Sequence, residues 1–142
     1  MDAIHADIEA FLERRNEAIR RRDIDRLMSF FAPDLVYFDL VPGLRYIGAA
    51  AMRERFLDWF GRWQSGIGQE VHDLMVTASG DVAAAHMLIR TSGTLTTGQQ
   101  VGYWVRASDV LRRSAQTWVI THEHISLPVD LQTRRAMMDL VP

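Results

Sequence analysis

The chain has 142 residues, enough for a single domain with one hydrophobic core and a modest cavity. Its composition, 48% hydrophobic and 24% charged, is typical of a globular protein. A net charge of -2 argues against nucleic-acid binding, and the absence of cysteine excludes disulfides and thiolate metal sites. We therefore expect one domain over residues 1–142.

The sequence carries no recognisable targeting or membrane segment. It opens with the polar and acidic stretch MDAIHADIEA, which does not resemble a signal peptide. No apolar run approaches the roughly 20 residues that a membrane-spanning helix needs. We expect a cytoplasmic protein with neither a membrane nor a nucleic acid as its partner.

Three helices are predicted in the first half of the chain. Apolar residues recur at three- and four-residue spacing over residues 2–22, which indicates an amphipathic helix. Arg15 falls on or beside this apolar stripe, and we interpret it as a side chain at the stripe's edge that reaches water. Asp23 is the predicted N-cap of a short second helix that Pro33 stops, and a third helix covers residues 49–63.

The second half of the chain is a run of predicted strands. Turn residues separate four long strands, and two shorter strands precede the third helix. Helices followed by an uninterrupted run of strands indicate an α+β fold, with helices packed on one face of a mostly antiparallel sheet. The predicted strands cover residues 35–40, 45–47, 70–78, 82–94, 100–112 and 117–126; residues 64–69 form a candidate lid, and the tail from residue 127 a covering arm.

Asp39 is embedded in the apolar stretch LVYFDLV and shares a strand face with Leu35 and Tyr37. A buried carboxylate either has a partner or its pKa rises toward neutrality, which makes it a usable general base or acid. The alternative is an aspartate that ends the strand and bonds to the following turn.

Two later strands carry polar groups that could face a pocket. His86 shares a face with Val82 and Leu88, as a core histidine or a pocket residue. Trp104, Arg106 and Ser108 share one face of the next strand, where Arg106 could anchor a carboxylate, stabilise an oxyanion or point to solvent.

His122 and His124, in the strand TWVITHEHIS, are the most distinctive pair of candidate site residues. Regular alternation places them on the face of Trp118 and Ile120, which we interpret as the wall of a pocket. Two histidines at this spacing could also bind zinc or iron together with His86 or Asp39. The competing interpretation is a hydrogen-bonded wall without a metal.

Five segments of the sequence carry a resemblance to a known family: RRDIDRLMSFFAPDLVYFD, YIGAAAMRERFLDWF, GDVAAAHMLIRTSG, YWVRASDVLRR and WVITHEHISLPVD. In this order and spacing they resemble the SnoaL-like and ketosteroid-isomerase-like branch of the nuclear transport factor 2-like superfamily. The resemblance implies a cone-shaped fold, in which a strongly curved sheet wraps around the first helix and leaves an apolar pocket. It also implies homodimers that pair through the sheet and no cofactor.

The resemblance assigns some site residues and leaves others open. Asp39 matches the catalytic base of ketosteroid isomerases. The oxyanion-binding tyrosine of those enzymes falls on Arg15, and their later carboxylic acid falls near Ser108, so neither donor is present in its usual form. Limonene-epoxide-hydrolase-like relatives use an Arg-x-Asp pair, and Arg106-Ala107-Ser108 lacks its acid.

The sequence thus predicts a cofactor-free enzyme for proton transfer next to a carbonyl, an isomerase or cyclase acting on a polycyclic or other apolar substrate. Asp39 would be the base, with donors from Arg106, Trp104 and His122 or His124. The remaining predicted substrate-binding residues are Tyr37, Phe56, Trp59, His86 and Ser108. The alternatives are a non-catalytic binding or dimerisation module of the same fold, and a metal enzyme using His86, His122 and His124.

Overall fold

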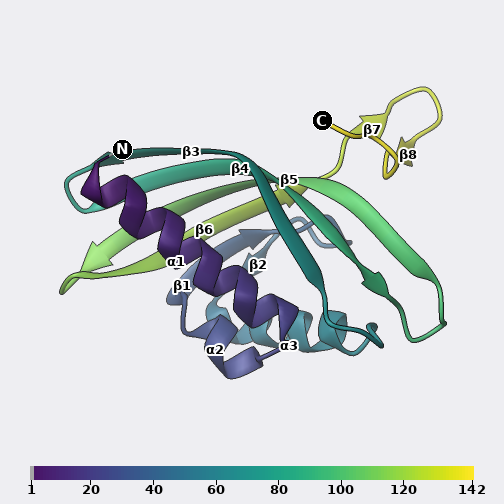
Figure 1. The fold of residues 1–142 in the computed structure, drawn as a ribbon, viewed down its shortest axis with the longest axis horizontal. Helices are drawn as coiled ribbons and strands as arrows, with labels where there is room; N and C mark the ends of the chain where they lie inside the picture. Colours follow the sequence, from purple (N-terminus) through teal and green to yellow (C-terminus); the bar gives the residue numbers. More distant parts are fainter. Residues whose placement is uncertain (1) are drawn as a thin grey trace.

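The structure is a computed structural model that describes residues 2–142. It confirms the α+β class, with two helices first, two strands before the third helix and the remaining strands after it (Figure 1). The elements are α1 (Ala3–Arg20), α2 (Ile24–Met28), β1 (Phe31–Phe38), β2 (Tyr46–Ile47), α3 (Ala49–Phe60), β3 (Gly68–Ser79), β4 (Val82–Thr94), β5 (Gln100–Ser114), β6 (Thr117–Ser126), β7 (Val129–Asp130) and β8 (Arg135–Ala136).

The helix starts follow from local capping. The Asp2 side chain accepts a hydrogen bond from the backbone N–H of His5 at 2.8 Å, which caps α1. Asp23 caps α2 as predicted, because it accepts from the backbone N–H of Arg26 at 3.1 Å. α2 is shorter than expected, since the chain is already extended from Phe31 onward.

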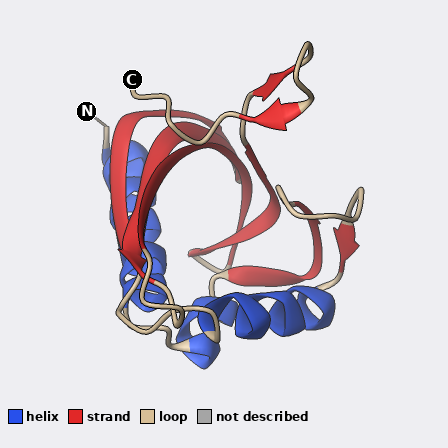
Figure 2. Ribbon diagram, turned by 90° about the vertical axis from the view of Figure 1, so that its right-hand side faces the viewer, coloured by secondary structure: helices blue, strands red, loops and turns tan. Residues whose placement is uncertain are grey.

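Six strands form one sheet in the order β2-β1-β6-β5-β4-β3. All neighbours are antiparallel except β1 and β6, which run parallel. Figure 2 shows that the long strands are strongly curved, with α1 along one side of the sheet and α3 across one end. The curved sheet therefore has a concave face toward the helices and a convex outer face.

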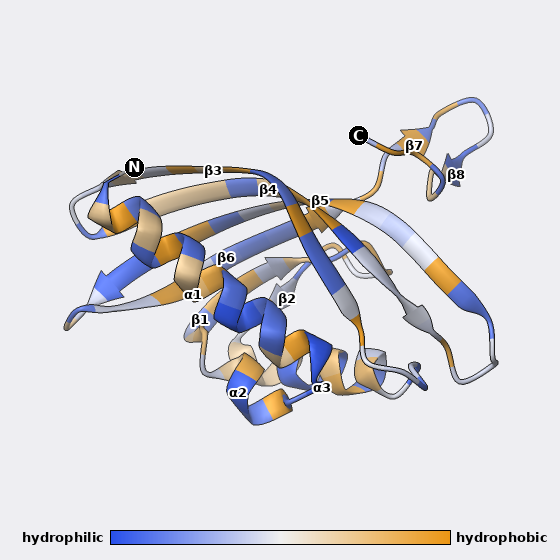
Figure 3. Cartoon of the chain, viewed as in Figure 1, coloured by the Kyte–Doolittle hydropathy of each residue, from blue (hydrophilic) through white to orange (hydrophobic). Residues whose placement is uncertain are grey.

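The hydrophobic core lies on the concave face. Inward residues of β4 and β5, such as Ala85, Ile89 and Val105, are buried against α1 residues such as Ile8 and Leu12. Their alternation with exposed neighbours is the period of two that a half-buried strand requires. Figure 3 shows polar residues in blue interrupting the apolar stretches of α1 and of the nearby strands.

One irregularity decides which residues of β6 face inward. Val110 pairs with His122, but Leu111 pairs with Ile120, so Thr121 is an extra residue in β6. Such a β-bulge interrupts the alternation of faces. Ile120 points inward before the bulge, whereas after it Glu123 does, and His122 lies on the outer side.

The candidate lid and the C-terminal tail both contact other parts of the chain. In the candidate lid, residues 64–69, Gln64 and Ser65 donate backbone hydrogen bonds to Thr94 at 2.8 and 3.2 Å, and Ile67 is buried. The tail forms the small hairpin β7–β8, which projects away from the sheet (Figure 1). Within residues 2–142, none of the helices is both long and apolar enough to cross a membrane.

Candidate functional site

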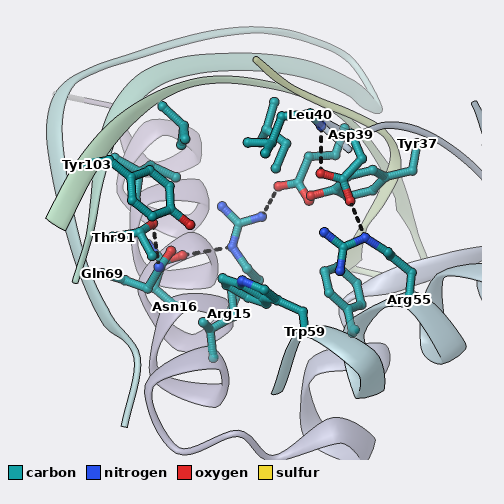
Figure 4. A pocket seen from close by; sticks show the side chains of 16 residues that line it. Arg15, Asn16, Tyr37, Asp39, Leu40, Arg55, Trp59, Gln69, Thr91 and Tyr103 are labelled. Carbon is teal, nitrogen blue, oxygen red and sulfur yellow. Dashed lines mark hydrogen bonds and ion pairs between the residues drawn. The ribbon is translucent and has the colours of Figure 1, made fainter. Parts of the chain in front are cut away.

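A cavity of about 70 Å³ lies between α1, α3 and the concave face of the sheet. Its apolar walls come from all three, and its polar lining includes four charged side chains (Figure 4). The apolar lining residues are Ile19, Leu40, Phe56, Trp59, Ile89, Val105 and Ile125, and the charged ones are Arg15, Asp39, Arg55 and Glu123.

Arg15 sits at the centre of a buried ionic cluster. Its side chain, only 1% exposed, forms a salt bridge with Glu123 and lies 3.6 Å from a carboxylate oxygen of Asp109. Glu123 and Asp109 are cross-strand partners on β6 and β5, so the sheet register holds both carboxyl groups toward α1. The expectation that Arg15 reaches water at the edge of its helix is wrong, because these carboxyl groups bind it inside the protein.

The charges of this cluster balance only if one carboxyl group keeps its proton. Burial, and then the neighbouring Glu123, raise the pKa of Asp109 well above its usual range, although Arg15 lowers it. Burial lowers the pKa of Arg15, but the charge of Glu123 and its hydrogen bond with Arg15 favour the charged guanidinium, and the net direction is upward. The cluster is therefore a guanidinium paired with the Glu123 carboxylate beside a neutral Asp109.

Asp39 follows the last residue of β1 and turns its side chain into the cavity, where it is 5% exposed. One carboxylate oxygen lies 3.0 Å from Arg55 Nε on α3, and the other accepts a hydrogen bond from the Leu40 N–H at 2.7 Å. Burial raises the pKa of Asp39, while Arg55 and the Leu40 N–H lower it; the net direction is upward. A positioned carboxylate with a raised pKa is what a general base needs.

The other end of the cavity is polar but uncharged. Asn16, Gln69, Thr91 and Tyr103 gather there, on the far side of Arg15 from Asp39 (Figure 4). Gln69 Nε2 donates a hydrogen bond to Thr91 Oγ1 at 3.0 Å.

An open groove of about 520 Å³ adjoins the cavity, with which it shares Leu40, Arg55, Trp59 and Tyr103. Its remaining lining is largely apolar and includes Met138 of the C-terminal tail. The enclosed cavity is too small for a polycyclic molecule, because pockets for drug-sized ligands typically hold about 300–1,000 Å³. A ring system would have to lie in the groove with only its reacting end inside.

Four of the sequence-predicted site residues line the cavity together: Tyr37, Asp39, Phe56 and Trp59. Burial raises the pKa of Tyr37 well above its usual range, and nearby Glu123 and Asp39 raise it further, so its hydroxyl keeps its proton.

The other six predicted residues lie on the outer face of the sheet and do not line the cavity: His86, Trp104, Arg106, Ser108, His122 and His124. For β4 and β5 the opposite face proved the more apolar, with Ala85, Met87, Val105 and Ala107 buried. For His122 and His124 the bulge at Thr121 reverses the face that simple alternation predicts.

His122, His124 and Arg106 contact residues outside the cavity. His122 Nδ1 lies 2.7 Å from the Val36 carbonyl oxygen, and both His122 and His124 pack edge-on against Phe38. Arg106 donates to Ser126 Oγ at 3.1 Å.

The structure does not gather the three histidines for a metal. His86 and His124 both pair with Ser108 from opposite sides, so an entire strand separates them. Over residues 2–142, no three His, Asp or Glu side chains come together in a way that could hold a metal.

Sequence reasoning missed most of the polar cavity residues, although some left a signal. Asn16 is four residues after Leu12 and three before Ile19, which places it on the apolar stripe of α1. Asp109, which contacts Arg15 behind the cavity lining, shares the period-two face of Val105 and Leu111, which is more apolar than the face of Trp104 and Arg106. Nothing local marks Glu123, because its orientation depends on the bulge.

A family model described as "SnoaL-like domain" matches residues 8–130. The chain belongs to the SnoaL-like family. This SnoaL-like protein is 32% identical to an NTF2-like protein of unknown function from Pseudomonas putida KT2440, with a TM-score of 0.90 over 99% of this chain and 97% of the other.

More distant structures share the fold. A ketosteroid isomerase-like protein from Erwinia carotovora atroseptica SCRI1043 is 23% identical, with a TM-score of 0.74 over 89% of this chain and 97% of the other. A protein of unknown function with a cystatin-like fold from Nostoc punctiforme PCC 73102 is 14% identical, with a TM-score of 0.74 over 94% and 98%. None of the curated proteins matches this SnoaL-like chain.

Proposed function

We propose that this SnoaL-like protein is an enzyme that moves a proton on a carbon next to a carbonyl group, with Asp39 as the base. The observation that carries the proposal is the placement of Asp39. Its carboxylate is nearly buried at one end of an apolar-walled cavity, fixed by Arg55 and the Leu40 N–H, and its pKa is raised. The correspondence of Asp39 to the base of ketosteroid isomerases supports the same role.

In this reaction the Asp39 carboxylate takes a proton from the α-carbon. The electrons of the broken C–H bond form the C=C bond of an enolate, and those of the carbonyl π bond move to its oxygen. The protonated Asp39 then returns the proton. Return to a conjugated carbon moves the double bond and completes an isomerisation, whereas return to the same carbon regenerates the ketone and is seen only as hydrogen exchange. A base held in place in this way contributes typically about 10²–10⁴-fold to the rate.

Arg55 has a supporting role in this scheme. Its guanidinium holds the Asp39 side chain by an ion pair at 3.0 Å and limits how far burial raises the pKa of Asp39. Without this contact a carboxyl group buried to this degree would be a weaker acid and less often ionised at neutral pH.

Binding of 2-naphthol tests whether Asp39 faces the reacting atoms. Its phenolate is a flat apolar anion that resembles an enolate. We expect calorimetry to show micromolar binding of 2-naphthol to wild type and tighter binding of the phenolate to Asp39→Asn, because the substitution removes a negative charge from the cavity that holds the anion. Thermal melting must first show that both proteins are folded.

Two outcomes would contradict the proposal. Equal phenolate affinity of the two folded proteins would mean that Asp39 does not face the ligand. Binding that is tight in both, without turnover of any enolisable ketone, would favour the non-catalytic binding module.

A further inference from the structure

The end of the cavity opposite Asp39 has polar groups that the proton transfer at Asp39 does not use. Asn16, Thr91 and Tyr103 come from α1, β4 and β5 and converge there, while Asp39 and Arg55 lie beyond Arg15 (Figure 4). None of the three carries a charge.

Asn16 has an unused donor at this end. Its side chain is 0% exposed, and its Oδ1 accepts a hydrogen bond from Arg15 Nε at 2.9 Å. An arginine can only donate, so Oδ1 must face Arg15, and Nδ2 is turned away from it. Nδ2 is buried and has no hydrogen-bond partner. Leaving a buried donor unpaired costs about 1–3 kcal/mol, which a ligand acceptor would recover.

Two hydroxyl groups complete this end. Thr91 Oγ1 accepts from Gln69 Nε2 at 3.0 Å, so its own hydrogen remains free to donate. Burial raises the pKa of Tyr103, the Trp59 indole beside it lowers it, and Asp39 raises it; the net direction is upward, and the hydroxyl keeps its proton. Asn16, Thr91 and Tyr103 therefore all offer N–H or O–H donors to a ligand.

The charges around the cavity cancel. Arg15 is bound to Glu123, and Arg55 to Asp39, and these four are the charged side chains in the lining. No positive charge is left to bind an anionic ligand, and a carboxylate would meet Asp39 and Glu123. The cavity thus favours an uncharged ligand whose oxygen only accepts hydrogen bonds.

We propose that Asn16, Thr91 and Tyr103 bind the carbonyl oxygen of the substrate, and that the substrate is an uncharged ketone or aldehyde with an apolar body. The apolar body lies in the adjoining groove of about 520 Å³, between residues such as Trp63 and Leu95. This inference rests on the proposed function for the reaction itself, but the binding it describes can be measured without turnover.

The arrangement gives the two ends of the cavity complementary roles. Asp39 removes the proton at one end, and the negative charge appears on the oxygen at the other, where neutral donors are already in place. Donors fixed before the reaction stabilise such an oxyanion more than mobile water does.

Three matched probes test the inference: 2-acetylnaphthalene, 2-naphthoate and 2-ethylnaphthalene. They share the ring system and differ only in a neutral carbonyl, a carboxylate or no oxygen. Calorimetry with wild type should show the ketone binding at least about fivefold more tightly than the ethyl compound, since one net hydrogen bond of about 1 kcal/mol corresponds to about fivefold in affinity. The naphthoate should bind more weakly than the ketone.

Two variants test where the carbonyl group of the ligand binds. Tyr103→Phe removes one hydroxyl without touching the buried ionic cluster, and Asn16→Leu removes the unused donor. Each should reduce the preference for the ketone over the ethyl compound about fivefold or abolish it, with the affinity for the ethyl compound unchanged. Trp104→Phe, on the outer face of the same strand, is the control and should leave all three affinities unchanged.

Three results would overturn the inference: tighter binding of the naphthoate than of the ketone, no preference for the ketone, or a preference that survives in both folded variants. In the last case a water molecule satisfies Asn16 Nδ2. The proposed function can fail separately from this inference. If the preference for the ketone depends on Tyr103 but Asp39 transfers no proton, this inference stands and only the proposed function is wrong.

Discussion

Asp109 and Glu123 are directly opposed across β5 and β6, and both carboxyl groups point to the single guanidinium of Arg15. All three side chains are almost completely buried. A low-dielectric interior makes an uncompensated charge costly, so this trio is stable as one ion pair and one neutral acid.

The neutral state of Asp109 predicts a pH dependence of stability. Its pKa in the folded protein is far above that in the unfolded chain, so the native state holds a proton that the unfolded state releases above about pH 4. The free energy of unfolding therefore falls as the pH rises toward the folded pKa of Asp109. Asp109→Asn removes this titration, and its stability relative to wild type should increase from pH 5 to pH 8 in urea unfolding.

The exposed Asp34 provides the control for this measurement. Asp34→Asn should follow the wild-type dependence on pH. If Asp109→Asn also runs parallel to wild type from pH 5 to pH 8, Asp109 is not a neutral acid in the native protein.

Removal of Glu123 should be far more costly than removal of Asp109. Glu123→Gln leaves Arg15 buried without its anionic partner, and breaking such a pair typically costs about 3–5 kcal/mol. Urea unfolding at pH 7 measures the loss, with Glu54→Gln on the exposed side of α3 as the control. A loss below about 1 kcal/mol would show that Arg15 is solvated or paired elsewhere.

These contacts also show where sequence reasoning stops. The order of elements and the burial of Asp39 follow from local patterns, because its apolar neighbours alternate regularly in β1. Glu123 was missed, since a bulge at Thr121 breaks the period of two on which every assignment of faces depends. Arg15 looked like a residue at the edge of a helix because its partners are 94 and 108 positions away, at Asp109 and Glu123.

Arg55 should set the pH range of the proposed reaction. It lowers the pKa of Asp39 against the effect of burial, so Arg55→Met should raise that pKa and move the rise of activity to higher pH. The pH profile of α-proton exchange in a bound ketone measures the shift. Arg53→Met, on the same helix but exposed and paired with Asp25, should leave the profile in place. A shift to lower pH in Arg55→Met would be inconsistent with this role.

The outer face of the sheet predicts pairing of two copies. Phe38, His124, Ser108, His86 and Met75 form one row across five strands there, and Met75 is 58% exposed. Burial of the apolar side chains of this row, Phe38 and Met75, against a second copy is favourable.

Light scattering tests the pairing. The mass should be twice 16.2 kDa for wild type and should fall toward the monomer in Met75→Glu. Leu57→Glu, at an exposed apolar position on α3, is the control and should stay dimeric. A wild-type monomer at micromolar concentration would refute pairing through the sheet.

The most direct test of the central claim is deuterium exchange at the α-methyl group of 2-acetylnaphthalene in D₂O, followed by NMR, with wild type and Asp39→Asn. The account predicts that wild type accelerates the exchange and that the folded Asn variant loses about 10²–10⁴-fold of this acceleration while still binding the ketone. Equal exchange rates in the two proteins, or no acceleration by wild type with the ketone bound, would contradict Asp39 as the base.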